Sequence, residues 1–212
     1  MVDYFDYNRE MAEKYHSWYE TGESRNIGTE QREILEIALE GARGGKLLEI
    51  GCGTCYFLSW LVERGFDVTG LDSSAGMLEF AKSRYGDDLN LHCGDAAEMS
   101  FEDRSFDVSM FLSSLEFIHN VEKTLAEAAR VTKSSILFML LNPEHPLNIE
   151  RMNKAKESGG VFSAAVLRSQ EELENVFNAS VPGSWDSEIV IEPYGIEYYM
   201  IEMIRRRKRR YR

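Results

Sequence analysis

Hydrophobic runs alternate with amphipathic stretches through the middle of the chain. Five short runs have the length and composition of strands: residues 46–50, 67–72, 89–95, 106–114 and 134–141. Three helical patterns lie between them, at residues 56–65, 75–86 and 120–132. The last run, SSILFMLL, is apolar on both faces, which is typical of a strand buried within a parallel sheet. This alternation predicts an α/β fold with a doubly wound, mostly parallel sheet.

Two segments do not follow this alternation of strand and helix patterns. Residues 1–45 are predicted to form a helical cap, because hydrophobic residues recur at helical spacing from Ile34 to Leu39. Residues 143–168 are polar and irregular, with a flexible point at Gly159, and neither a helix nor a strand is predicted there.

The last part of the chain returns to regular structure. A helical pattern over residues 169–177 is followed by two strand patterns, 187–192 and 198–204, with Pro193 and Gly195 between them. These strands are predicted to form an antiparallel pair. Together with the core they make a seven-stranded, Rossmann-like sheet.

Composition places the chain among soluble globular proteins. It has 212 residues, of which 43% are hydrophobic and 28% charged, and this length suits a single domain. No apolar run approaches the roughly 20 residues needed to span a bilayer. The first ten residues are acidic and aromatic, unlike a signal peptide. Three cysteines are too few for a disulfide framework, so a cytoplasmic location is expected.

The charge is distributed unevenly. Residues 205–212 hold seven of the 24 basic residues, which leaves a net charge of −19 on residues 1–204. An acidic body argues against non-specific nucleic-acid binding. The basic tail is able to bind RNA, DNA or an anionic membrane surface, but folding back on the acidic body or remaining solvated is the favoured interpretation.

A glycine turn after the first strand carries the clearest chemical signal. Gly51 and Gly53 follow the strand 46–50 and precede a helix, so the turn presents backbone N–H groups and the positive end of a helix to a ligand. Asp72 ends the next strand about 20 residues later, the spacing at which an acid reaches a ribose diol. The pattern predicts a site for a nucleoside cofactor.

Two nucleotide-binding classes fit this turn poorly. A dinucleotide fingerprint needs a third glycine where the helix packs on the strand, and Tyr56 occupies that position. A phosphate-binding Walker loop needs Gly-Lys-Ser or Gly-Lys-Thr, which does not occur in the sequence.

Five motifs in order resemble the class I S-adenosylmethionine-dependent methyltransferases, in the small-molecule branch that includes ubiquinone and menaquinone biosynthesis. They are AEKYHSWYETG at 12–22, EIGCGTC at 49–55, LDSSAGML at 71–78, GDA at 94–96, and the block from 101–120 with its helix end AARVTK at 128–133. The resemblance covers roughly residues 10–141. Cys55 departs from it, since a glycine is usual there. The resemblance implies S-adenosylmethionine as cofactor and S-adenosylhomocysteine as product.

The resemblance also implies roles for residues around the glycine turn. Gly51 and Gly53 let the backbone approach the methionine part of the cofactor. Glu49 faces its cationic amino group, and Asp72 accepts both ribose hydroxyls. Tyr15 corresponds to the tyrosine that closes over the cofactor.

Five further residues are assigned to the cofactor in the same way. Asp95 is expected to bind the adenine amino group, with the N–H of Ala96 nearby. Ser73 and Met77 are expected beside the ring, and the carbonyl of Ser113 near the amino group. Turn or core roles remain open alternatives, for Met77 above all, since a methionine on a helix is usually core.

Methyl transfer itself is an in-line displacement, in which alignment supplies most of the rate enhancement. A general base is needed only when the nucleophile is protonated. Glu116 and His119, after the fourth strand, are the predicted catalytic residues. His16, Glu144 and His145 are further candidates for this role, all open to a structural interpretation.

The cysteines allow a second interpretation of the glycine turn. Cys52 and Cys55 form a CxxC pattern, which occurs in redox and metal sites. Zinc would need two more ligands, and only Cys93 and scattered histidines are available, so no metal is predicted. Cys55 is expected instead to crowd the cofactor slightly, and redox sensitivity of Cys55 is favoured over metal binding.

These observations predict one methyltransferase domain over residues 1–204, followed by the tail. Its parts are a helical cap at 1–45, a cofactor-binding core at 46–141, a substrate lid at 142–168, and a C-terminal helix and strands at 169–204. The predicted reaction is methyl transfer to a small-molecule acceptor. The alternatives are an RNA-modifying methyltransferase anchored by the tail and a non-catalytic protein that binds S-adenosylmethionine.

Overall fold

The structure, a computed structural model, describes residues 8–159, 161–191 and 197–205. Within these residues no helix is both long and apolar enough to cross a membrane. The basic residues 206–212 and the predicted turn at Pro193 and Gly195 lie outside the described part of the chain.

A single seven-stranded sheet forms the centre of the molecule, in the order β3-β2-β1-β4-β5-β7-β6. The strands are β1 (Lys46–Ile50), β2 (Asp67–Asp72), β3 (Asn90–Cys93), β4 (Phe106–Leu112), β5 (Thr132–Leu141), β6 (Trp185–Ile191) and β7 (Tyr198–Arg205). Strands β1 to β5 pair in parallel, whereas β7 is antiparallel to both β5 and β6. The predicted mostly parallel sheet with an antiparallel C-terminal pair is confirmed.

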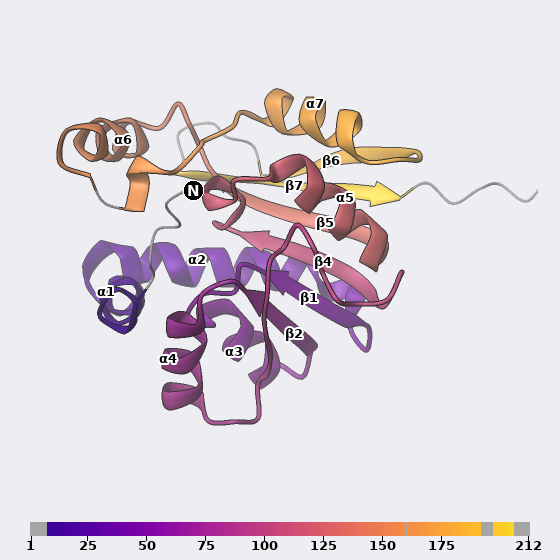
Figure 1. The fold of residues 1–212 in the computed structure, drawn as a ribbon, viewed down its shortest axis with the longest axis horizontal. Coiled ribbons are helices and arrows are strands. Elements are labelled where there is room, and N and C mark those ends of the chain that lie inside the picture. Colours follow the sequence, from indigo (N-terminus) through magenta and orange to yellow (C-terminus); the bar gives the residue numbers. More distant parts are fainter. Residues whose placement is uncertain (1–7, 160, 192–196, 206–212) are drawn as a thin grey trace, which may run out of the picture.

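Helices cover both faces of this sheet (Figure 1). They are α1 (Arg9–Glu20), α2 (Gly22–Ala38), α3 (Tyr56–Glu63), α4 (Ala75–Tyr85), α5 (Val121–Val131), α6 (Pro146–Ser158) and α7 (Gln170–Ser180). Short 3-10 turns occur at Glu40–Ala42, Leu115–Phe117 and Val161–Ser163. The helical N-terminal cap is therefore present as α1 and α2.

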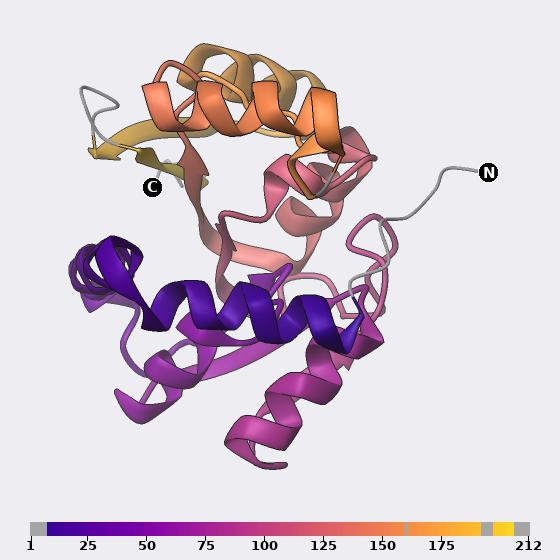
Figure 2. The same ribbon diagram turned by 90° about the vertical axis from the view of Figure 1, so that its left-hand side faces the viewer.

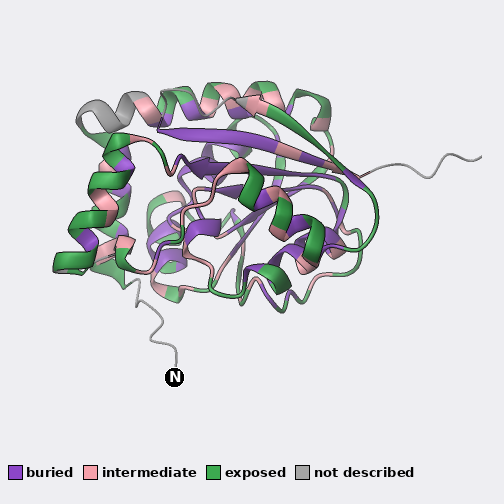
Figure 3. Cartoon of the chain, turned by 90° about the horizontal axis from the view of Figure 1, so that it is seen from above, coloured by how far each residue is buried: buried purple, intermediate pink, exposed green. Residues whose placement is uncertain are grey.

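Alternating side chains of each strand supply two separate hydrophobic cores. In β1, Leu47 packs into the core shared with α2 and α3, whereas Leu48 and Ile50 pack into the core shared with α5 and α7. Figure 3 shows the buried strands enclosed between helices whose outer surfaces are exposed. Burial on both faces explains why the strands read as almost continuous apolar runs.

The prediction for residues 143–168 was wrong, because most of the segment is helical. Helix α6 begins with Pro146 at its first turn, where a fixed φ and a missing N–H do no harm. Asn148 is fully buried and its amide donates to the backbone oxygens of Asn142 and Glu197, at 2.9 and 2.7 Å. A helix held by such polar contacts has no hydrophobic periodicity in its sequence, so the analysis of hydrophobic positions did not predict it.

Side-chain caps begin two of the helices. Ser74 caps α4 by accepting a hydrogen bond from the backbone N–H of Met77 at 3.1 Å. Helix α7 begins with a capping box between Ser169 and Glu172.

The carboxyl ends of the parallel strands meet at one edge of the sheet, and helices α1 and α6 lie at that edge (Figures 1 and 2). Helix α6 follows β5 directly, while α1 comes from the N-terminal cap. Ligands of open α/β sheets bind outside the carboxyl ends of the strands. The residues singled out in the sequence therefore belong to a single edge.

Candidate functional site

The glycine turn leaves β1 along a tightly folded path. The backbone N–H groups of Gly51 and Cys52 donate to the carbonyl of Leu71 at 2.7 and 3.1 Å, which ties the turn to β2. Gly51 has a φ of 75°, and a Cβ atom there would lie 2.6 Å from the Cβ of Ser114. The turn thus requires glycine at this position for both its conformation and its close contact.

Cys55 takes a left-handed conformation, with a φ of 60°, at the residue that caps α3. Glycine adopts this conformation without steric cost, which accounts for the usual glycine at this position. The Cys55 side chain is fully buried, with its Sγ 3.8 Å from the Sγ of Cys52. It packs in the hydrophobic core that α3 shares with β1, and its crowding of the cofactor stays a prediction.

The described residues contain no group of three or more His, Cys, Asp or Glu side chains arranged to hold a metal ion. Within this part of the chain, all three cysteines are free thiols.

Asp72 connects the end of β2 to the glycine turn. Its two carboxylate oxygens accept hydrogen bonds from the backbone N–H groups of Gly53 and Ser74, at 2.7 and 2.8 Å. Burial raises the pKa of Asp72, and the two backbone donors oppose this effect. Each oxygen keeps a further lone pair, so the structural role and the acceptance of ribose hydroxyls are compatible.

Glu49 is 2% exposed and lies beneath the same turn. Burial raises its pKa well above the usual range, and the charge of Asp72 acts in the same direction. Its Oε2 atom has no hydrogen-bond partner among the described residues. A buried carboxylate oxygen without a donor suits a cationic amino group, the partner that the sequence analysis assigned to this residue.

Tyr15 lies over the turn from α1. Its Cε1 atom is 3.9 Å from the position that a Cβ atom of Gly53 would take, and its hydroxyl is 3.2 Å from that of Tyr19. The placement agrees with a residue that covers a bound cofactor.

The other proposed cofactor residues occupy varied surroundings. Met77 is buried against Ala12 and Phe80, between α1 and α4, as its core alternative requires. Ser73 is exposed after β2. Asp95 is exposed and accepts a hydrogen bond from the backbone N–H of Ala97 at 2.8 Å.

Two more of these residues lie after β3 and β4. Ala96 is partly buried against the α5 side of the sheet. Ser113 has a φ of 53°, and its N–H donates to the carbonyl of Met139 at 2.8 Å. Cys55 and Ser113 are therefore two non-glycine residues in the left-handed region at the same edge, a form of strain that often occurs at functional sites.

Glu116 and His119, the two predicted catalytic residues, differ sharply in burial. Glu116 is 2% exposed, its Oε1 accepts the N–H of Leu141 at 2.7 Å, and its Oε2 has no partner among the described residues. Burial raises the pKa of Glu116 to about 7, while the N–H of Leu141 and the charge of Arg168 oppose this rise. His119 is exposed just before α5. Only Glu116 has the buried, perturbed environment that characterises catalytic acids and bases.

The additional candidates lie in other settings. His145 precedes α6 as its capping residue and Glu144 is exposed beside it. His16 is buried, with its ring nitrogens 3.0 Å from Thr54 Oγ1 and 3.3 Å from the Tyr85 hydroxyl. It joins α1 to the glycine turn and to α4, so its structural interpretation is favoured.

Sequence reasoning did not single out Arg151, which connects the cap to α6. Its guanidinium forms an ion pair with the largely buried Glu197 and lies 5.9 Å from the ring centres of both Trp18 and Phe162. Its partners are distant in the sequence, and a lone arginine in a polar segment carries no signal.

Comparison with known proteins adds to this geometry. Residues 48–140 match a protein-family model described as a methyltransferase domain. Demethylmenaquinone methyltransferase of Renibacterium salmoninarum is 32% identical over 115 residues, covering 54% of this chain and 48% of that protein. Malonyl-acyl-carrier-protein O-methyltransferase of Serratia marcescens is 36% identical over 116 residues, covering 52% and 45%. The chain thus spans about half the length of these curated relatives.

A solved structure from Thermotoga maritima supports the same fold. It is described as an S-adenosylmethionine-dependent methyltransferase, possibly a histamine N-methyltransferase, and it superposes with a TM-score of 0.71 at 20% identity. The match covers 93% of this chain and 98% of that one. Residues 48–140 are therefore similar in sequence to a methyltransferase domain, and the chain shares its fold with this solved methyltransferase.

Proposed function

We propose that this protein binds S-adenosylmethionine at the glycine turn and transfers its methyl group to a small-molecule acceptor. The unpaired Oε2 of Glu49 carries the proposal, because it is a buried acceptor beneath a turn that Tyr15 covers. Class I domains of the matched family use this cofactor, which supplies a methyl group already activated as a sulfonium.

Residues of three elements would hold the cofactor. Glu49 would take the amino group, and the open backbone at Gly51 and Gly53 would take the methionine part. Asp72 would accept the ribose hydroxyls through its remaining lone pairs, at about 1.5–3 kcal/mol for each charge-assisted bond. Asp95 stays the proposed partner of the adenine amino group, since its exposed carboxylate keeps one oxygen free of the Ala97 bond.

Glu116 would act as the general base when the acceptor atom carries a proton. A base works best with a pKa near the working pH, and burial raises the pKa of Glu116 to about 7. The N–H of Leu141 fixes one oxygen and leaves the other to receive a proton. His119 stays a weaker proposal, since it is exposed to water.

The names of the relatives support a small-molecule acceptor, since one is named for demethylmenaquinone and the other for a malonyl group on a carrier protein. In this chain, α6 and α1 flank the edge where the methyl group would lie (Figure 2). We therefore propose residues 142–168 as the lid over the acceptor. The proposed cytoplasmic location rests on the small number of cysteines.

Calorimetric titration with S-adenosylmethionine and S-adenosylhomocysteine tests the cofactor site. Wild type is expected to bind with micromolar affinity, and Asp72→Ala to bind at least tenfold more weakly. Asp67→Ala is the matched control, because Asp67 is exposed at the opposite end of the same strand. Absence of binding to folded wild type, or equal losses in the two variants, would refute the proposal.

A further inference from the structure

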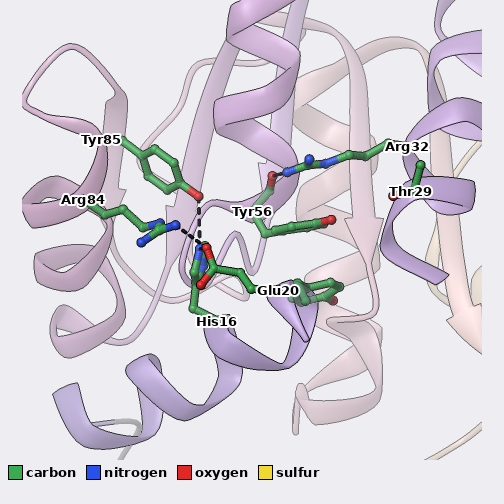
Figure 4. Close-up of a pocket in the computed structure, with 8 residues that line it drawn as sticks. His16, Glu20, Thr29, Arg32, Tyr56, Arg84 and Tyr85 are labelled. Carbon is green, nitrogen blue, oxygen red and sulfur yellow. Dashed lines mark hydrogen bonds and ion pairs between the residues drawn. The ribbon is translucent and has the colours of Figure 1, made fainter. Parts of the chain in front are cut away.

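A cavity of about 410 Å³ lies among α1, α2, α3 and α4. Its walls include His16, Glu20, Arg32, Tyr56, Arg84 and Tyr85 (Figure 4). Of the residues named as candidates for the cofactor site or the general base, only His16 lines it. Its volume is in the range of small-molecule sites.

Arg32 supplies an uncompensated positive charge to this cavity. Its guanidinium lies 3.7 Å from the centre of the Tyr56 ring and donates through Nη2 to the Tyr56 carbonyl at 2.7 Å. Among the described residues Arg32 has no carboxylate within ion-pair distance, and its Nε–H has no acceptor. The contacts with Tyr56 hold the guanidinium in place without neutralising it.

Arg84 provides a second cation on the opposite side of His16 and Tyr56 (Figure 4). It pairs with Glu20, and both side chains are nearly half exposed. The same Glu20 carboxylate lies 3.8 Å from His16 Nε2. Glu20 thus pairs with Arg84 and lies beside His16, and Arg32 has no share in this ion pair.

His16 is a buried imidazole in the wall of the cavity. Burial lowers the pKa of His16, and the charges of Arg84 and Arg32 lower it further against the opposing effect of Glu20. Both cations therefore act on the same imidazole, which is neutral near pH 7. The charged residues in the cavity walls are two arginines and one glutamate, in a chain whose net charge is −12.

We propose that this cavity binds a small organic molecule through an oxyanion group, which Arg32 holds with Arg84 in support. Guanidinium groups match the two oxygens of a phosphate or a carboxylate in a bidentate manner. The Tyr85 hydroxyl, 3.3 Å from His16 Nε2, would be an additional donor to such a group in the tautomer that carries a proton on Nε2. The cavity is larger than a bare ion needs, which favours an organic ligand.

Nuclear magnetic resonance titration of the whole chain without cofactor tests this proposal. Inorganic phosphate and malonate serve as probes at constant ionic strength, with the His16 resonance assigned through its loss in His16→Gln. Saturable shifts and a raised His16 pKa are expected, because an anion offsets the two cations. Shifts with phosphate alone would indicate a phosphate ligand, and shifts with both probes a general oxyanion site.

Arg32→Gln is expected to weaken binding of the probe at least tenfold, and Arg84→Gln to weaken it less. Arg9→Gln is the matched control, since Arg9 is exposed on the same helix as His16. Shifts that do not saturate, or that survive in both folded cavity variants, would overturn the proposal. If Arg32→Gln does not fold, Arg32→Lys is the replacement variant. It keeps the positive charge but loses the bidentate guanidinium geometry, so it is expected to weaken binding by a smaller factor. Because cofactor is absent, the result is independent of the proposed methyl transfer.

Discussion

Glu116 is the proposed general base, and its burial also makes the stability of the fold depend on pH. Its pKa rises from 4.5 to about 7 on folding because burial removes the carboxyl group from water. The unfolded chain therefore loses this proton at a lower pH than the native one. Protonated Glu116 therefore adds roughly 3 kcal/mol to the free energy of unfolding. This contribution is fully present below pH 4.5 and is lost as the pH rises through about 7.

Glu116→Gln should remove this pH dependence, since the amide keeps an acceptor for the Leu141 N–H and cannot ionise. Denaturant unfolding at pH 5 and pH 8 measures the change. If Glu116 is the base, kcat/KM should also fall by a factor of about 10²–10⁴ and lose its rise near pH 7. Glu122→Gln, at an exposed position on α5, is the control. Parallel pH profiles of wild type and Glu116→Gln would contradict the assigned environment.

At the scale of elements, His16 attaches the cap helix α1 to the rest of the fold. One ring nitrogen meets Thr54 in the glycine turn and the other meets Tyr85 in α4. Thr54 is fully buried, so loss of its partner leaves a hydroxyl without water or protein to replace it. The position of Tyr15 over the turn depends on the same helix.

His16→Phe should destabilise the protein by about 1–3 kcal/mol at pH 7, since the ring volume is kept while both hydrogen bonds are lost. Burial holds the folded pKa of His16 below 6.5, so the unfolded chain takes up a proton first as the pH falls. The advantage of wild type should therefore shrink between pH 7 and pH 5. Urea unfolding measures it, with Lys14→Ala on the exposed face of α1 as the control. An advantage that grows towards pH 5 would contradict the neutral imidazole.

At the scale of the molecule, sequence patterns predicted the sheet because its chemistry is local. Leu47 and Leu48 face different cores. Because both faces of such a strand are buried, a run of about five apolar residues is enough to identify it in the sequence. Helix α6 was not predicted because the buried side chain of Asn148 forms hydrogen bonds with Asn142 and Glu197. A buried polar residue does not contribute to a hydrophobic periodicity. The contact of His16 with Thr54 spans 38 residues, and no spacing rule anticipates a pair so far apart.

The fold brings Glu49 and Asp72, at the ends of β1 and β2, to one edge with Glu116, which lies in the 3-10 turn after β4. Burial raises the pKa of each, and Glu49 and Asp72 also repel one another. A cationic cofactor placed among these groups should favour their ionised forms, so its binding near pH 7 should release protons.

The heat of binding should then vary with the ionisation enthalpy of the buffer, because the released protons are taken up by the buffer. Titrations with S-adenosylmethionine in phosphate and in Tris at pH 7 measure the effect. Glu49→Gln should reduce the proton release, since the variant has no carboxyl group to ionise beneath the turn. Glu63→Gln, near the end of α3 and exposed, should leave it unchanged. Equal heats in the two buffers for wild type would mean that Glu49 is already ionised before the cofactor arrives, or stays protonated beside it. Either result would rule out the proton-coupled pairing of Glu49 with the amino group.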